Sequence, residues 1–163
     1  MAVPTHTGTE APTAYPAPPW RLQGHGCCLL RLIPIEQARA VVPKSLAVVP
    51  ILPGRTLGLV YLAVYTAGST LEYHELIVIT ALVRHRHRLG AWISHIYVDD
   101  QRSVTGGRSI WGLPKQLAQF DWPADSAAIE VRQEGQVLCR LQAATGLPAL
   151  PLPVWAPAFG RRG

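Results

Sequence analysis

Cysteine is scarce in this chain of 163 residues, whose only cysteines are Cys27, Cys28 and Cys139. An odd count with two adjacent members is not a disulfide framework, and no Cys-x-x-Cys pair is present to suggest zinc. The histidines do not supply a metal site either, because their spacing does not place three of them on one rigid face. The sequence therefore predicts a protein of a reducing compartment, the cytoplasm, with no metal and no disulfide framework.

Long hydrophobic runs are also missing. The longest apolar stretches, Leu57–Tyr65 and Leu76–Val83, are well short of the roughly 20 residues that a membrane-spanning helix needs. At the N-terminus no cationic segment precedes an apolar core, so we expect no signal peptide. These observations predict a cytoplasmic protein without a membrane partner.

Charged residues make up only 15% of the chain, and the net charge is +5. The densest basic run is Arg84–Arg88 (RHRHR), which lies between two apolar segments. We interpret it as a solvated hairpin connection; the alternative is contact with phosphate or another anionic ligand. No aromatic platform or nucleic-acid-binding motif accompanies the run, so no nucleic-acid partner is expected.

Hydrophobic residues, by contrast, are abundant at 48%, and a chain of this length is long enough to bury one core. The 15 prolines and 14 glycines are not periodic, and they separate short segments as in a β-rich domain. We expect an extended arm over residues 1–19, one domain over residues 20–145 and a proline-rich segment over residues 146–163.

Strand-forming residues recur in segments that short turns connect. The apolar run Gly26–Ile33 is predicted to be a buried strand. Three later strands are predicted to form an antiparallel meander, and two more to form a hairpin around the turn Glu134–Gln136. The meander strands are Thr56–Tyr65, Glu72–Val83 and Ala91–Val98, and the hairpin strands are Ile129–Gln133 and Val137–Gln142.

Helices are predicted where proline or aspartate supplies a start signal. Pro34 should begin a helix that runs to about Val42, before Pro43 stops it. Asp99 or Asp100 should cap a second helix over residues 101–110, which Gly112 ends.

Lys115 follows that break, and Pro114 is predicted to begin another short helix with Lys115 as its second residue. An ordinary lysine has a pKa of about 10.4, so a nucleophilic lysine needs surroundings that disfavour the ammonium form. Apolar walls from Trp111, Leu113 and Leu117 would act in this direction, as would the positive end of a helix. Taken alone, these residues favour the alternative, a surface lysine whose neighbours belong to the core.

Three segments in order carry a family resemblance: EYHELIV (Glu72–Val78), GAWISHIYVDD (Gly90–Asp100) and GGRSIWGLPKQL (Gly106–Leu117). Together with PPW before the first strand and VVPKSL (Val41–Leu46), they resemble the acetoacetate decarboxylase family over roughly Pro18–Gln142. The resemblance implies an α+β, mainly antiparallel β-barrel or cone with a few short helices. The shortness of the chain suggests a barrel that is incomplete at its C-terminus. The resemblance also implies that Lys115, in GLPK, is a Schiff-base lysine, an amine that acetoacetate decarboxylase is known to activate.

Other site residues follow from the same resemblance. Glu75 matches a family glutamate in the active site, and alternation along a strand places Tyr73 on its face. An inward carboxylate can orient substrate or relay a proton; the alternative is a solvated glutamate at an edge. Tyr73, Arg108, Trp111 and His25 are predicted to bind substrate. Arg108 has the structural alternative of binding carbonyl groups, and His25 lies in the stretch where the family has an arginine for the substrate carboxylate.

The chain departs from the family pattern at Gln116, where the decarboxylases carry a second lysine. We therefore predict a cofactor-independent, decarboxylase-type carbon–carbon lyase that uses Lys115 on a small oxo-acid or other carbonyl substrate. One alternative is a Schiff-base aldolase or dehydratase. Another is a noncatalytic small-molecule binder in which Glu75 and Lys115 form an internal ion pair. Exposed strand edges also predict a homo-oligomer.

Overall fold

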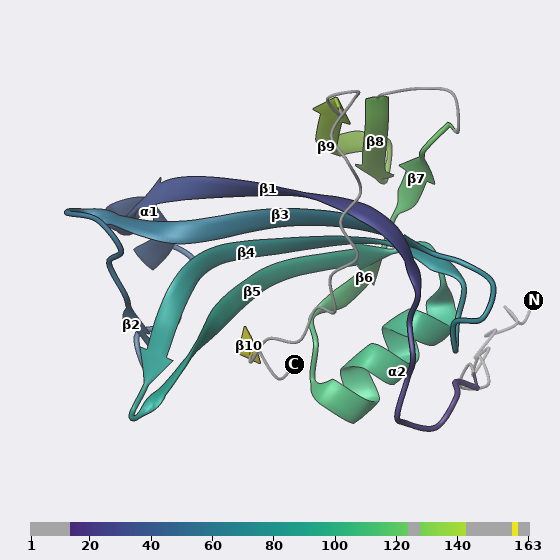
Figure 1. Cartoon of the computed structure of the whole chain (residues 1–163), viewed down its shortest axis with the longest axis horizontal. Coiled ribbons are helices and arrows are strands. Elements are labelled where there is room, and N and C mark those ends of the chain that lie inside the picture. The colour runs from purple at the N-terminus through teal and green to yellow at the C-terminus, as the bar shows by residue number, and fades with distance from the viewer. Residues whose placement is uncertain (1–13, 124–127, 143–157, 160–163) are drawn as a thin grey trace, which may run out of the picture.

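The computed structural model describes residues 14–123, 128–142 and 158–159. They form a long curved sheet, a smaller sheet against one side of it, and two helices (Figure 1). The predicted mainly antiparallel α+β architecture is confirmed, although the two sheets do not close into a barrel within the described residues. Residues 1–13 of the predicted arm and most of the proline-rich segment lie outside the described residues.

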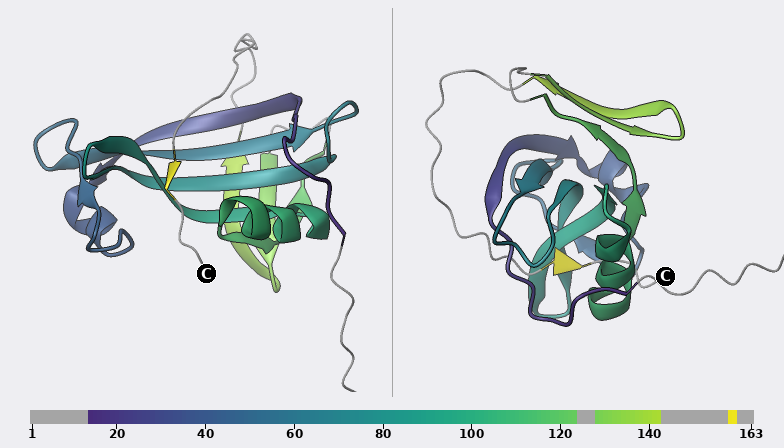
Figure 2. Two further views of the ribbon diagram at one scale, coloured as in Figure 1. Left: turned by 90° about the horizontal axis from the view of Figure 1, so that it is seen from below. Right: turned by 90° about the vertical axis from the view of Figure 1, so that its right-hand side faces the viewer.

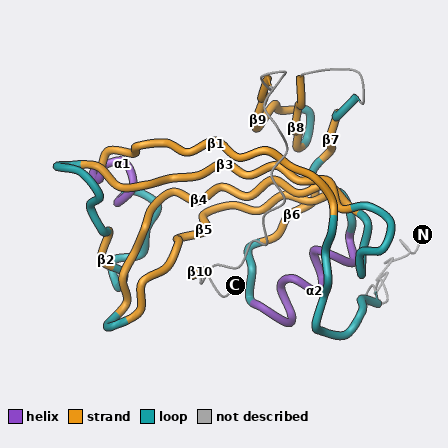
Figure 3. Tube along the Cα trace, in the orientation of Figure 1, coloured by secondary structure: helices purple, strands orange, loops and turns teal. Residues whose placement is uncertain are grey.

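The main sheet has seven strands: β1 Gly24–Pro34, β2 Ala47–Val48, β3 Arg55–Tyr65, β4 Tyr73–His85, β5 Arg88–Val98, β6 Lys115–Leu117 and β10 Ala158–Phe159. Its four long strands run side by side in the order β1-β3-β4-β5, each antiparallel to its neighbour (Figure 3). The predicted meander of β3, β4 and β5 is therefore confirmed. The short strands β6 and β10 both pair in parallel with β5, and β2 pairs with β4.

Strand β1 does not have the predicted buried character. It pairs with β3 alone among the described strands, and Leu30 and Leu32 are 61% and 45% exposed. An apolar run cannot by itself distinguish a central strand from an edge strand, which is why this prediction was wrong. At Gly24 a side chain would overlap the carbonyl oxygen of Val64, so glycine permits the close approach of β1 to β3.

The first helix, α1, spans Ile35–Arg39 and is shorter than predicted. Pro34 keeps an extended backbone as the last residue of β1, and beyond Arg39 the chain closes in turns. Val42 lies in the core with Ala38. Tertiary packing therefore ends the helix before proline could.

The second helix, α2, spans Gln101–Trp111 and agrees closely with the prediction. The Asp100 carboxylate accepts a hydrogen bond of 2.6 Å from the backbone N–H of Arg102, and Gly112 ends the helix with a φ of 64°. Burial of Asp100 opposes its charge, but hydrogen bonds from the side chain and backbone of Arg102 outweigh it and lower its pKa.

The short helix predicted at Pro114 is wrong, because this segment is the strand β6. Lys115, Gln116 and Leu117 pair with Ile96, Tyr97 and Val98 of β5. The free edge of β5 offers these residues a ladder of backbone hydrogen bonds, which overrides the local preference of proline for a helix start.

The smaller sheet comprises β7 Gln119–Asp121, β8 Ala128–Gln133 and β9 Gln136–Gln142. Glu134 and Gly135 connect β8 and β9 with φ values of 49° and 79°, a two-residue turn that confirms the predicted hairpin. Hydrophobic side chains of both sheets pack between them, and Figure 2 shows the smaller sheet crossing the main one. These buried side chains are Leu62, Leu76, Tyr97, Ala118, Ile129 and Val131.

Alternation along the strands divides the main sheet into two faces. Leu62 and Leu76 are cross-strand partners on the face covered by the smaller sheet. Glu75 belongs to the opposite face, where α2 lies (Figure 1). Neither described helix is long and apolar enough to cross a membrane.

Replacing Leu62 by alanine should lower the free energy of unfolding by about 2–5 kcal/mol, because Leu62 is completely buried between the sheets. The matched variant Leu30→Ala, at the exposed edge, should change it by less than about 0.5 kcal/mol. Urea denaturation measures both values. Equal losses would show that the contact between the sheets does not stabilise the fold.

Candidate active site

The side chain of Lys115 lies between the main sheet and α2, and its exposed fraction is 3%. It runs across Gly107 of α2: a Cβ atom there would be only 2.6 Å from the lysine Cδ. The neighbouring Gly106 makes similar room for the ring of Trp20, where a Cβ would lie 2.5 Å from a ring carbon. The two glycines of the GGR motif thus let a lysine and a tryptophan pack against one helix.

Three polar side chains surround the amine. Nζ of Lys115 lies 2.8 Å from Oε1 of Glu75 and donates hydrogen bonds to Oγ of Ser103 at 2.9 Å and to the hydroxyl of Tyr73 at 3.3 Å. It also lies 5.0 Å from the centre of the Tyr73 ring. Each of these four residues is less than 5% exposed. The amine and the carboxylate are therefore enclosed together, away from water.

Glu75 is held from its other side by Tyr65, whose hydroxyl donates a 2.9 Å hydrogen bond to Oε2. Tyr65 lies opposite Tyr73 in the register of β3 and β4, and their ring centres are 4.9 Å apart. The sequence interpretation placed Tyr73 beside Glu75 correctly but missed Tyr65 and Ser103. The short connection between β3 and β4 was the available signal for Tyr65, because it makes the ends of the two strands neighbours.

Both tyrosines are strongly biased toward their neutral form. Burial, and then the negative charge of Glu75, raise the pKa of Tyr65 and of Tyr73 far above the usual value of about 10. A hydrogen bond involving Ser103 offsets part of the effect at Tyr73. The two phenols therefore remain available as hydrogen-bond donors or acceptors at any physiological pH.

Arg108 contacts the backbone of the site. Its Nε donates a 2.7 Å hydrogen bond to the main-chain oxygen of Lys115, as in the structural alternative considered for it. Arg108 thereby fixes the start of β6 relative to α2.

Two other predicted substrate contacts lie elsewhere. Trp111 is 45% exposed, and its ring packs edge-on against Trp20 at 4.8 Å. His25 pairs with Val64 in the register of β1 and β3, and its side chain lies on the opposite face of the sheet from Glu75. The centre of its ring is 5.8 Å from the centre of the Trp122 ring. The structure therefore does not bring Trp111 or His25 to the amine.

Gln116 also points away from the amine. Its side-chain oxygen accepts a 3.2 Å hydrogen bond from Gln133 at the tip of the β8–β9 hairpin. Successive side chains of a strand point in opposite directions, so Gln116 cannot share the surroundings of Lys115.

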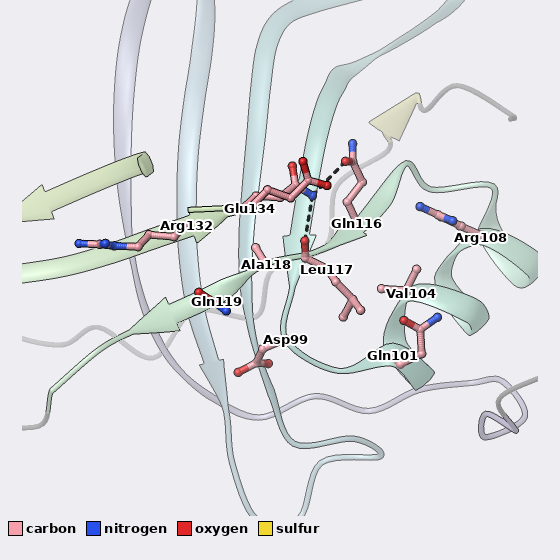
Figure 4. A pocket seen from close by; sticks show the side chains of 11 residues that line it. Asp99, Gln101, Val104, Arg108, Gln116, Leu117, Ala118, Gln119, Arg132 and Glu134 are labelled. Atoms are coloured by element: carbon pink, nitrogen blue, oxygen red, sulfur yellow. Dashed lines mark hydrogen bonds between the residues drawn. The ribbon is translucent and has the colours of Figure 1, made fainter. Parts of the chain in front are cut away.

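A cavity of about 610 Å³ lies beside β6 and α2 (Figure 4). Arg108 and Gln116 line it, together with residues of the β8–β9 hairpin, but Lys115 and Glu75 do not. Within the described residues no cluster of three or more His, Cys, Asp or Glu side chains could hold a metal ion. The chemistry available at the enclosed site is that of an amine, a carboxylate and three hydroxyl groups.

Comparison with known proteins matches this chain to one family. The sequence model of the acetoacetate decarboxylase (ADC) family covers residues 2–161. Among curated relatives, the tomato (Solanum lycopersicum) protein NEOXANTHIN-DEFICIENT 1 is 36% identical over 106 residues, which are 65% of this chain and 36% of that protein. The chain thus spans about a third of the length of this relative.

Solved structures share the fold. Acetoacetate decarboxylase from Legionella pneumophila has a TM-score of 0.61 at 20% identity, covering 80% of this chain and 53% of that one. The enduracididine biosynthesis enzyme MppR, complexed with the condensation product of pyruvate and imidazole 4-carboxaldehyde, has a TM-score of 0.58 at 16% identity, with coverages of 82% and 58%.

Replacing one partner of the buried ion pair should destabilise the fold strongly, whereas replacing both partners together should destabilise it little. Lys115→Met and Glu75→Leu should each lower the free energy of unfolding by about 3–5 kcal/mol, because each leaves an unpaired charge inside the protein. The free energy of unfolding of the double variant should fall by much less than the sum of the losses in the two single variants. Urea denaturation of all four proteins gives the coupling energy. Additive losses would mean that the two groups are not paired in solution.

Alkaline pH should destabilise the fold through the buried phenols. The raised pKa values favour folding below pH ~10, and this stabilisation is lost as pH rises above that value, because the unfolded chain then ionises its tyrosines. The slope is up to about 1.4 kcal/mol per pH unit for each phenol. Tyr73→Phe should flatten the decline in urea stability above pH ~10. Leu62→Ala is the control, since it should lower stability without changing the slope.

Proposed function

The chain belongs to the acetoacetate decarboxylase family, whose characteristic enzymes are decarboxylases, and from that premise we propose that it is a cofactor-independent carbon–carbon lyase. Lys115 forms a Schiff base with a small oxo-acid or a related carbonyl compound. The observation that carries the proposal is the enclosed amine, 2.8 Å from a carboxylate and within hydrogen-bond distance of two hydroxyl groups.

In the first step, the ammonium of Lys115 passes a proton to Glu75. The neutral amine then adds to the ketone carbon, forming a carbon–nitrogen bond, and the former carbonyl oxygen takes the proton that the nitrogen gives up, becoming a hydroxyl. Glu75 returns its proton to this hydroxyl, which leaves as water as the carbon–oxygen bond breaks, and the iminium remains. The hydroxyls of Tyr73 and Ser103 adjoin Nζ and are suited to donate hydrogen bonds to the departing oxygen.

The iminium next withdraws the electron pair of the bond to the β-carboxylate. Carbon dioxide leaves, and an enamine remains on Lys115. Protonation of its carbon and addition of water return the ketone and the free amine. The Glu75 carboxylate, positioned by Tyr65, balances the positive iminium during these steps.

Activation of the amine differs from the two-lysine arrangement that the resemblance implied. Gln116 is neutral and engaged with Gln133, and the start of β6 is not a helix end. Proton transfer to Glu75 within the enclosed pair is therefore the step on which nucleophilic attack depends.

Two alternatives each have an observation in their favour. An aldolase or dehydratase would use the same imine and enamine, and MppR, which shares the fold, has been captured with a condensation product. A noncatalytic binder is favoured by the complete Glu75–Lys115 ion pair and by a curated relative that is not named as a decarboxylase. We also retain the homo-oligomer and the cytoplasmic location as proposals. Among the described strands β1 pairs only with β3, and its other edge is the surface that we propose for the oligomer.

Borohydride trapping tests the proposal sharply, because the chain contains only two lysines, Lys44 and Lys115. Incubation with acetoacetate, pyruvate and other small oxo-acids, followed by reduction, should add the substrate mass to Lys115. Lys115→Arg should abolish the adduct, whereas Lys44→Arg should leave it unchanged. Glu75→Gln should slow its formation by roughly 10²–10⁴-fold.

Product analysis then separates the alternatives. Release of carbon dioxide identifies a decarboxylase, and condensation or dehydration products identify the aldolase-type reaction. Small-molecule binding without any adduct at Lys115 across the panel would overturn the Schiff-base proposal in favour of the noncatalytic binder.

A further inference from the structure

The end of the main sheet that carries α1 and β2 concentrates positive charge. We call it the basic end. Among the described residues it contains seven lysine and arginine residues but a single acidic residue, Glu36. All seven cations are exposed. They are Arg31, Arg39, Lys44, Arg55, Arg84, Arg86 and Arg88.

Segments far apart in the sequence come together at this end. The β4–β5 turn lies beside β2, because Arg84 pairs with Ala47, and the His85 ring is 3.4 Å from the backbone oxygen of Ser45. Arg55 donates a 3.4 Å hydrogen bond to the backbone oxygen of Leu32. Figures 1 and 2 show α1, β2 and the β4–β5 turn at the same end of the molecule.

The cations of the basic end are not neutralised by carboxylates. Among the described residues, none of the seven forms an ion pair, whereas Arg102, Lys115, Arg132 and Arg140 each do. A cluster of unpaired cations creates a positive field that favours an anionic partner.

Large aliphatic side chains are exposed beside these charges. Val41, Ile51, Leu52 and Leu89 are between 42% and 52% exposed; the first three lie in turns of the same end, and Leu89 is the second residue of β5. Leu52 lies in the turn before β3, and Leu89 lies directly after the β4–β5 turn. Cations flanking exposed aliphatic residues form an amphipathic surface.

We propose that the basic end docks this protein on the surface of an anionic lipid membrane. The arginines and Lys44 contact the lipid headgroups, and the exposed aliphatic side chains insert among them. Exposed aliphatic side chains favour lipid, because they can insert into a membrane surface, whereas duplex nucleic acid is bound through its phosphates and base edges and single strands are bound through aromatic stacking. The sequence predicted no membrane partner because no segment could span a bilayer, but surface docking requires no spanning segment. The basic end also explains the RHRHR run as an anion contact rather than only a solvated turn.

The docking surface is separate from the Lys115 site, which lies at the α2 end of the same sheet (Figure 1). The two proposals therefore fail independently. Loss of vesicle binding should leave the borohydride adduct at Lys115 unchanged.

Co-sedimentation of the full chain with vesicles tests the proposal. Vesicles of phosphatidylcholine with about one-third phosphatidylserine should bind the protein, and vesicles of phosphatidylcholine alone should not. Binding should weaken as salt increases. The triple variant Arg84→Gln, Arg86→Asn, Arg88→Gln should bind about a hundredfold more weakly, since each cation near such a surface contributes roughly a factor of five.

A control with the same change in net charge is Arg21→Gln, Arg102→Gln, Arg140→Gln, which should retain binding. Leu52→Ser changes a single loop residue and should weaken binding without affecting the fold, as checked by thermal unfolding. Equal loss in both triple variants would overturn the proposal, because net charge alone would then account for binding. No binding to anionic vesicles would overturn it as well, as would displacement from them by duplex DNA at matched phosphate concentration.

Discussion

The buried ion pair between Lys115 and Glu75 constrains the end of this structure at which α2 packs against the main sheet. Two opposite charges that are each less than 5% exposed lose their hydration and must satisfy each other. Their meeting requires β4, β6 and α2 to converge, because these elements supply Glu75, Lys115 and Ser103 respectively. The Tyr65 hydroxyl and the Arg108 guanidinium complete the arrangement by holding the carboxylate and the lysine backbone.

The predictable parts of the fold were those that local chemistry specifies. The meander, the β8–β9 hairpin and α2 depend on strand formers, a two-residue turn at Glu134–Gly135, and caps at Asp100 and Gly112, all of which are visible in the sequence. The errors occurred where a distant element decided the outcome. The edge of β5 drew Lys115–Leu117 into a strand, and core packing at Val42 ended α1 early.

In the candidate site, too, local sequence patterns predicted some residues, and the packing of distant elements decided the others. Motif order and strand alternation identified Lys115, Glu75 and Tyr73, but Ser103 could be found only from the rotation of α2 relative to β6. His25 was assigned to the site because its stretch matched a family position. Its side chain points to the opposite face, and a shift of one residue along a strand is enough to cause that reversal.

The paired glycines of α2 have a consequence for how the site is assembled. Each glycine within a helix costs roughly 1 kcal/mol of intrinsic helix stability relative to alanine, so Gly106 and Gly107 make α2 a weak helix by itself. The ring of Trp20 and the alkyl chain of Lys115 occupy the space that the missing side chains leave. Helix formation and lysine burial therefore become one cooperative event. Any ligand that draws Lys115 off Gly107 should also loosen α2, so the backbone amides of this helix would report occupancy of the site through their rates of hydrogen exchange.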